Sequence, residues 1–417
     1  EVIAQCWARI DPYLDVLSLI SISKSCHPLR DLVVDDATGK IKASVVLVNN
    51  VLEVDSEGQI NWESPSARIR HYVPMLINAI HFPSLTKLKI GFPPNVSVWN
   101  GQPVVDETAF PEAFPMFAIE AENATNIEEL EINVNTLIVH EEGGMLQSTF
   151  EILRDNLAFV IKRTRKLKRL TIINEVTFEH GAYSKYSSAF LAAMVPVIQA
   201  CLLSVEEVTV LCGDIPSCRD YPNAGRDFFK AILSLQKLKT LKVQIQSFYG
   251  PLLNDFVDAA HSIQTTLGRF PSESLEYINI PVRFLQIEEG QQPPHPRPSI
   301  SSFLSLCCNA RALRGLRMWL PRECWDTNSI IALSHLLNET PSLDNLSLHF
   351  HGYKDRSGRL LAYMLNFIDE RKSSPGPHVH LFQMGYLIEQ SESFEALGRY
   401  AEAFEHEGET LWQFLHD

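Results

Sequence analysis

The sequence lacks a disulfide framework, a long apolar run and an excess of basic residues. Its 8 cysteines are too few for a disulfide scaffold of 417 residues, so buried free thiols in a reducing compartment are expected. No run of about 18 apolar residues occurs, which argues against a membrane-spanning helix and a membrane partner. These absences favour a cytoplasmic or nuclear protein.

Positive charge is scarce. Lys and Arg number 36 against 50 Asp and Glu, which gives a formal net charge of −14. A general nucleic-acid binder would carry a basic surface, so no nucleic-acid partner is predicted. The overall acidity suggests instead a protein partner with basic patches.

Enzymatic motifs are also missing. The sequence contains no glycine-rich phosphate loop, no His-Glu-x-x-His and no Gly-x-Ser-x-Gly. The pairs His349/His351 and His378/His380 could each share a strand face, but a zinc site would need two further ligands. We therefore predict a protein that is not an enzyme, with no catalytic residue, no metal and no cofactor.

A short apolar pattern recurs along most of the chain. Each copy has an apolar residue, two spacers, an apolar residue, one spacer and an apolar residue, and successive copies start 30 to 42 residues apart. Such a period is typical of a stack of similar units with an extended surface, which favours binding over catalysis. The copies are Leu85-Leu88-Ile90, Ile127-Leu130-Ile132, Leu167-Leu170-Ile172, Val205-Val208-Val210, Leu238-Leu241-Val243, Leu275-Ile278-Ile280, Leu313-Leu316-Met318 and Leu343-Leu346-Leu348.

Each copy is expected to form a strand that is followed by a loop, a helix and a turn. Helical spacing of apolar residues predicts amphipathic helices over 146–161, 253–267 and 327–337. Parallel strands joined by helices stack with the helices on one side. The predicted fold is therefore an α/β solenoid over 35–375, with parallel strands on the concave face and helices outside.

The two ends differ from the repeats. Residues 1–34 are expected to form short helices with a break at Asp11-Pro12. Residues 41–54 read as an irregular strand that caps the stack. Residues 376–417 are predicted as a C-terminal cap, with a last strand near Val379 and Leu381 and an acidic amphipathic helix through Phe394–Phe404.

The repeats resemble those of leucine-rich-repeat proteins of the long, irregular type. Residues 1–34 resemble an F-box, because a helix, the Asp11-Pro12 break, a Leu-rich helix and a Ser/Lys-bearing third helix follow in the order typical of that family. The combination resembles the F-box/leucine-rich-repeat proteins of fungi. The chain begins at Glu1 without methionine, and the Leu-Pro that usually opens the F-box motif is expected before it.

The resemblance implies a substrate-recognition subunit of a cullin-RING ubiquitin ligase. In this interpretation Leu14, Leu17, Ile20 and Leu29 dock on the small adaptor subunit of the ligase, and the repeats capture a protein substrate. In the alternative, the same apolar residues only cap the first repeat. The chain would then be a structural or effector subunit of a larger assembly with no role in ubiquitin transfer.

The spacer residues of the repeats are expected to line the concave face, since side chains alternate across a strand. Their charges alternate in sign, so the face is not a continuous phosphate track. Tyr277 and Trp319 are possible interface anchors, unless loops cover Trp319. The positions expected to contact a partner are Lys87, Lys89, Glu129, Glu131, Arg169, Lys242, Tyr277, Arg317, Trp319 and His349.

Overall fold

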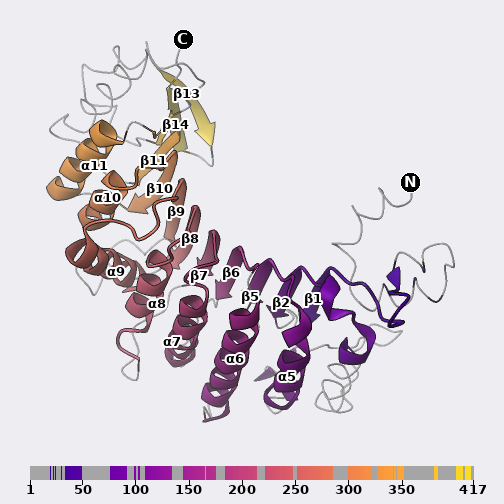
Figure 1. Ribbon diagram of the computed structural model, residues 1–417. Helices are drawn as coiled ribbons and strands as arrows, with labels where there is room; N and C mark the ends of the chain where they lie inside the picture. The colour runs from indigo at the N-terminus through magenta and orange to yellow at the C-terminus, as the bar shows by residue number, and fades with distance from the viewer. Residues whose placement is uncertain are drawn as a thin grey trace. The chain divides into compact units, whose positions relative to one another are not determined.

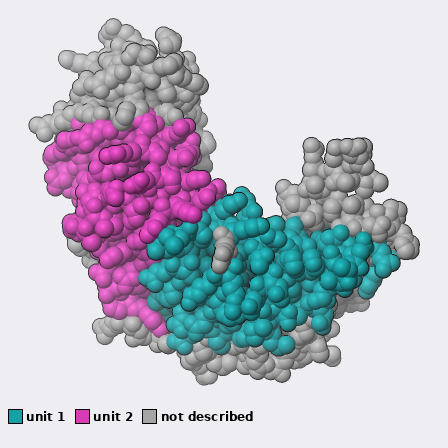
Figure 2. All heavy atoms as spheres, in the orientation of Figure 1, with its two compact units in different colours: residues 1–205 teal, residues 206–417 magenta. Residues whose placement is uncertain are grey.

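Parallel strands alternate with helices along the chain, in an α/β fold that confirms the predicted order of elements (Figure 1). The chain divides into two compact units, residues 1–205 and 206–417 (Figure 2), and this division falls inside the range predicted as one solenoid. The computed structural model describes residues 19, 22, 24, 30, 33–48, 76–91, 98–99, 102–103, 109–133, 144–164, 166–174, 184–213, 221–247, 251–284, 299–321, 326–340, 342–343, 345–351, 380–383, 401–406 and 409–414.

The first unit contains four parallel strands in chain order, together with a short antiparallel pair, β3 and β4. The four strands are β1 (Val45–Val48), β2 (Lys87–Gly91), β5 (Glu129–Asn133) and β6 (Arg169–Asn174). The remaining elements are η2 (Phe82–Ser84), β3 (Val98–Trp99), β4 (Gln102–Pro103), α5 (Ala109–Glu120), η3 (Ala121–Asn123), α6 (Gly144–Arg163) and α7 (Ser184–Ala200).

In the second unit, six strands run parallel from β7 to β12, and a hairpin of β13 and β14 adds antiparallel to β12. The parallel strands are β7 (Glu207–Cys212), β8 (Thr240–Ser247), β9 (Tyr277–Phe284), β10 (Gly315–Pro321), β11 (Asn345–His351) and β12 (His380–Gln383). The other elements are α8 (Ala224–Leu233), α9 (Pro251–Leu267), α10 (Ser301–Cys308), α11 (Thr327–Glu339), β13 (Ala401–His406) and β14 (Glu409–Phe414).

The repeated apolar pattern sets the register of the strands. In β5, Leu130 and Ile132 are buried while the alternate residues of the strand are not, so one strand face enters the core. The carbonyl before each strand accepts two N–H groups from the next repeat. That of Thr86 accepts from Glu128 and Glu129 at 2.7 and 3.1 Å, and that of Lys239 accepts from Glu276 and Tyr277 at 2.8 and 2.9 Å. Equivalent positions of successive repeats are thereby brought side by side.

The core of each unit lies between the sheet and the helices, which all lie against the same face of that sheet (Figure 1). Buried phenylalanines line the helix layer. In the second unit, ring centroids lie 5.3 Å apart for Phe228–Phe229 and Phe229–Phe256, and 5.1 Å apart for Phe256–Phe303. We call the sheet face away from the helices the open face of that unit.

The helices predicted over 146–161, 253–267 and 327–337 are confirmed as α6, α9 and α11, and the predicted last strand is confirmed as β12. The capping strand predicted within 41–54 includes β1. Among the residues described, no helix is both long enough and apolar enough to cross a bilayer.

The prediction of an acidic C-terminal helix is wrong for the part of that segment that the structure describes. Ala401 to His406 form strand β13, which pairs with β14, and β14 in turn pairs with β12. The edge of a parallel sheet presents unpaired backbone N–H and C=O groups, and a hairpin satisfies them whereas a helix would not. This tertiary pairing overrides the helical spacing of the apolar residues.

The adaptor-binding residues predicted at the N-terminus, Leu14, Leu17, Ile20 and Leu29, lie outside the described residues. Leu19 and Val33, which are described, are both buried.

Candidate functional site

The predicted contact residues whose side chains the structure describes lie on the open face, because strand side chains alternate. In β2, Leu88 and Ile90 are buried against the helices, and the intervening Lys87 and Lys89 are partly exposed on the other side. The same alternation places Glu129, Glu131 and Arg169 on the open face of the first unit. It places Lys242, Tyr277 and Arg317 on that of the second.

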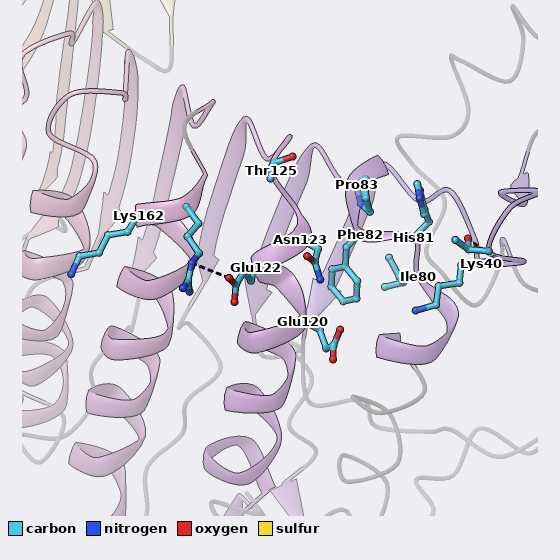
Figure 3. Close-up of a pocket in the computed structure, with 12 residues that line it drawn as sticks. Lys40, Ile80, His81, Phe82, Pro83, Glu120, Glu122, Asn123, Thr125 and Lys162 are labelled. Carbon is cyan, nitrogen blue, oxygen red and sulfur yellow. Dashed lines mark hydrogen bonds and ion pairs between the residues drawn. The ribbon is translucent and has the colours of Figure 1, made fainter.

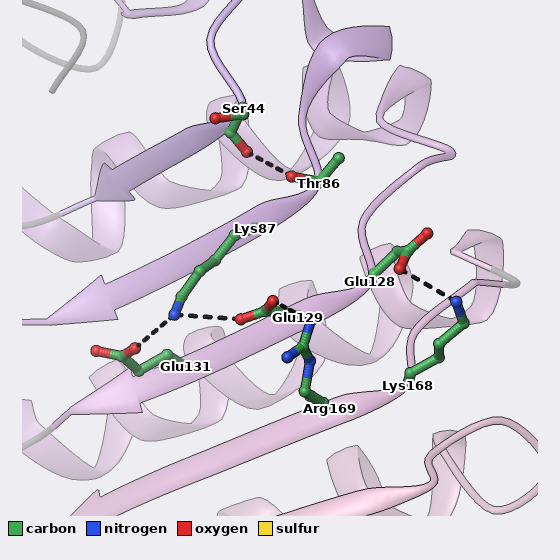
Figure 4. A network of polar contacts seen from close by, with 8 residues as sticks. All are labelled: Ser44, Thr86, Lys87, Glu128, Glu129, Glu131, Lys168 and Arg169. Atoms are coloured by element: carbon green, nitrogen blue, oxygen red, sulfur yellow. Dashed lines mark hydrogen bonds and ion pairs between the residues drawn. The ribbon is translucent and has the colours of Figure 1, made fainter. Parts of the chain in front are cut away.

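In the first unit, five charged residues form one ladder of ion pairs across β2, β5 and β6. Figure 4 shows four of them, Lys87, Glu129, Glu131 and Arg169. Lys87 Nζ lies 3.2 Å from a Glu129 carboxylate oxygen and 3.3 Å from one of Glu131, and Lys89 Nζ lies 3.3 Å from Glu131. Arg169 pairs with Glu129 from the other side. The strand register places Lys87, Glu129 and Arg169 directly opposite one another, so the alternating charges meet.

A second line of alternating charge precedes the strands. Lys168 Nζ lies 3.2 Å from Glu128, and in the second unit Lys239 Nζ lies 2.8 Å from Glu206. The hydrogen bond to Glu206 raises the pKa of Lys239. Within the ladder of β2, β5 and β6, each cross-strand pair contributes roughly 0.2–1 kcal/mol. The charged residues of the ladder and of this second line therefore pair with neighbours on adjacent repeats. Their first role is to hold neighbouring repeats together.

The second unit presents an aromatic side chain on its open face. Tyr277 in β9 is directly opposite Gly315 in β10, and its side chain is 44 % exposed. A Cβ atom at Gly315 would lie only 2.6 Å from Tyr277 Cδ1 and 3.1 Å from Cε1. The ring therefore lies against the backbone of the next strand, which only glycine permits at this position.

A row of polar residues lies next to this aromatic. Asn279 is in register with Lys242 on one side and with Arg317 on the other. Lys242 is half-buried and Arg317 is exposed. The Oδ1 atom of Asn279 is buried and has no hydrogen-bond partner. The row therefore places Lys242 and Arg317 on either side of an unsatisfied amide oxygen.

The structure brings some predicted residues together and leaves others undecided. Lys87, Lys89, Glu129, Glu131 and Arg169 form the ladder, and Lys242, Tyr277 and Arg317 lie close by register in β8 to β10. The backbones of Trp319 and His349 are opposite each other in β10 and β11, but their side chains are outside the described ones.

Sequence reasoning placed Gly315 among the spacers of the concave face but did not anticipate that the Tyr277 ring packs against it. The signal was present, because this glycine takes the place of a side chain at a strand spacer, Leu313-Arg314-Gly315-Leu316. Glycine inside a strand often marks a close approach of another group.

A polar pocket of about 640 Å³ in the first unit was also not anticipated (Figure 3). Arg163 at its rim pairs with Glu122 at 3.3 Å and lies 3.9 Å above the Phe159 ring. His81 Nδ1 is 2.8 Å from Ser84 Oγ. Its lining mixes both charge signs, and the hydroxyl of the lining residue Thr38 donates to Asp35 Oδ1 at 2.7 Å. Lining residues include Lys40, His81, Phe82, Glu120, Glu122, Asn123, Lys162 and Arg163.

Reactive chemistry is not concentrated elsewhere in the described residues. Within these ranges no group of His, Cys, Asp and Glu side chains is arranged to hold a metal ion. Cys201, Cys212 and Cys307 are buried free thiols, and burial raises the pKa of Cys201 to about 12, which makes it a poor nucleophile. Burial likewise raises the pKa of Asp255, a residue of α9 whose carboxylate faces Gly225 of α8, to about 7.

The candidate site is therefore a surface, the open face of β8 to β10 around Tyr277. No protein-family model matches this chain, and a comparison with curated proteins finds no match.

Proposed function

We propose that this chain is a protein-binding scaffold of the leucine-rich-repeat type, a solenoid with its strands on the concave face and its helices outside. The support is the regular register of the repeats, in which equivalent positions lie side by side in successive parallel strands. A stack of this kind offers a long surface for another macromolecule. The proposal assigns no catalytic step to the chain.

The observation that carries the proposal is the packing of the Tyr277 ring against the backbone at Gly315. A tyrosine that is 44 % exposed but held against a neighbouring strand can contact a partner with little loss of conformational entropy. Exposed tyrosines of this kind are enriched among the residues that dominate binding energy in protein interfaces. Tyr277 is thus the expected anchor of the bound partner.

A photo-crosslinking amino acid at position 277 tests this function. The matched control carries it at Leu267, which is 55 % exposed at the end of α9, away from the open face. We expect a covalent adduct with a discrete protein at position 277 and none at position 267. Equal labelling at both positions, or no adduct at position 277, would overturn the proposal.

Within this function, we propose that the chain is the substrate-recognition subunit of a cullin-RING ubiquitin ligase. The support is the F-box-like order of residues 1–34, which precedes the repeats as in the F-box/leucine-rich-repeat proteins. Leu14, Leu17, Ile20 and Leu29 would contact the adaptor subunit, and the open face would hold the substrate.

The competing proposal is a structural or effector subunit without a ubiquitin role, whose N-terminal residues cap the first repeat. The burial of Leu19 and Val33 within the chain itself favours such capping. Pull-down of the purified adaptor separates the two. We expect the wild type to retain it, Leu14→Asp with Leu17→Asp to lose it, and the control Leu267→Asp to keep it. If the wild type retains no adaptor, the ligase role is refuted and the scaffold role stands.

A further inference from the structure

The strands around Tyr277 contain no acidic residue. Strands β8, β9, β10 and β11 contain neither Asp nor Glu, and their open face includes Lys242 and Arg317, in a chain whose net charge is −14. The positive charge of this patch is therefore local, and it opposes the charge of the molecule as a whole.

The first unit shows how this chain treats cations on its open face when they are structural. Lys87 and Lys89 each have a carboxylate of the next strand within 3.3 Å. Lys242 occupies the same kind of position but makes no ion pair in the described part of the chain. Its in-register neighbours are Thr209 and Asn279, which are uncharged.

The nearest carboxylate by register on this face is Glu207 in β7, which lies two residues away from the position opposite Lys242. A half-buried ammonium group has given up part of its hydration, and without an acid beside it that loss is not offset inside the chain. A carboxylate brought by a partner would offset it, so charge complementarity identifies the chemistry of the occupant.

The spacing of the two cations also fits a peptide. Lys242 and Arg317 flank Asn279 in one register row, and two strand spacings place their Cα atoms about 10 Å apart. A segment in the polyproline II conformation has three residues per turn and advances about 3.1 Å per residue, so acids three residues apart lie on the same side at about this distance. Tyr277 lies one row away on the same face, where it can take an apolar side chain between them.

We infer that the open face of β8 to β11 binds an acidic segment of a partner protein. Carboxylates of the segment pair with Lys242 and Arg317, and an aromatic or apolar side chain of the segment packs on Tyr277. This inference rests on the proposed scaffold function and names the chemistry of its partner. A nucleic acid fits less well, because two cations on an acidic chain cannot neutralise a long run of phosphates.

Binding of labelled peptides, measured by fluorescence anisotropy, tests the inference. The probes are three repeats of Glu-Tyr-Ser-Glu and the same peptide with every Glu replaced by Gln. We expect the Glu probe to bind more tightly, and Lys242→Glu with Arg317→Glu to weaken it at least about tenfold. The matched control is Lys230→Glu with Lys237→Glu, two exposed lysines off the open face, with the same change in net charge. It should change the dissociation constant less than about twofold.

Circular dichroism spectra that match the wild type establish that each variant is folded. Equal affinity for the Glu and Gln probes, or an equal loss in the control variant, overturns the inference. Tighter binding of single-stranded oligothymidine than of the Glu probe also overturns it, in favour of a nucleic acid. If the Gln probe binds equally well and Tyr277→Ala abolishes that binding, only the acidic partner is refuted. If Tyr277→Ala changes the affinity for neither probe, the role of Tyr277 as the anchor in the scaffold function is refuted as well.

Discussion

At the scale of single residues, Gly315 shows how one missing side chain shapes a surface. Glycine inside a strand is unfavourable because it adds backbone entropy to the unfolded chain and packs nothing. Here the space that it leaves is occupied by the Tyr277 ring, whose Cδ1 atom would lie 2.6 Å from any Cβ atom at this position. The gain is an aromatic side chain fixed on the sheet.

Replacing the glycine should therefore have opposite effects in two backgrounds. Gly315→Ala alone is expected to destabilise the protein by about 1–3 kcal/mol, since the ring must shift. In a Tyr277→Ala background the same change should be neutral or stabilising by about 0.5–1 kcal/mol. Urea unfolding of the four proteins measures this coupling. Equal effects in both backgrounds would show that the ring and the glycine do not interact.

A second residue-scale prediction concerns pH. Burial is the main cause that raises the pKa of Asp255 from 3.8 to about 7, and the nearby Asp258 adds to it. Between these values the folded state binds the proton more tightly than the unfolded state. Stability from this group is therefore full below about pH 4 and is lost as the pH rises to about 7.

Asp255→Asn should remove this dependence, because the amide cannot ionise. The free energy of unfolding between pH 5 and 7.5 should fall less in the variant than in the wild type, and at pH 7.5 the variant should be the more stable protein. The control is Glu273→Gln, an exposed acid paired with Arg269 at 3.1 Å. An unchanged pH slope in Asp255→Asn would contradict the prediction.

At the scale of elements, charges and backbone pairing decide which strands are neighbours. The ladder across β2, β5 and β6 places Glu129 between Lys87 and Arg169. A shift of one strand by one residue would turn these charges toward the helices. The ladder thus favours one register, beyond the energy of its individual pairs.

Removing the carboxylate of Glu129, which lies between Lys87 and Arg169, should reveal how much the ladder stabilises the fold. Glu129→Gln is expected to cost roughly 0.5–2 kcal/mol, because two cross-strand pairs are lost, and Glu129→Lys should cost more because like charges then face each other. Urea unfolding at low and high salt is the measurement, and both losses should shrink at about 1 M salt. A loss that salt does not reduce would mean that packing, rather than charge, is responsible.

At the scale of the whole molecule, helix packing follows the order of the chain. Among the described helices the main contacts join sequence neighbours, α5 with α6, α6 with α7, and α8 to α11 in succession. In such an array stability is close to a sum of units and their neighbouring interfaces. A core defect should therefore act locally.

Phe256→Ala tests this locality, since the Phe256 ring contacts both Phe229 and Phe303. The expected cost is about 3–5 kcal/mol. Hydrogen exchange should show lost protection in α8, α9 and α10, with α5 and α6 unchanged. The reciprocal variant Phe117→Ala should affect α5 and α6 and spare α9. Equal loss of protection throughout the chain would contradict local packing.

The elements best predicted from the sequence are those whose burial follows directly from the local pattern. Leu88 and Ile90 entered the core as spaced apolar residues should, and α9 was predicted because its apolar face repeats at helical spacing. The segment from Ala401 failed, because its pairing partner is the distant edge of β12. The polar pocket was missed for a similar reason, as its lining comes from four separate turns and helix ends.

The sequence by itself determined that strands and helices alternate and which side chains of each strand are buried, because hydrophobic periodicity acts within a few residues. It also determined that positions such as Lys87 and Lys242 face away from the core. Only the tertiary structure decided that Lys87 is paired with acids while Lys242 has no acid partner among the described residues, and that the Tyr277 ring packs against Gly315. Those outcomes depend on which residues of separate repeats become opposite one another, and that register is set by hydrogen bonds between strands distant in the chain.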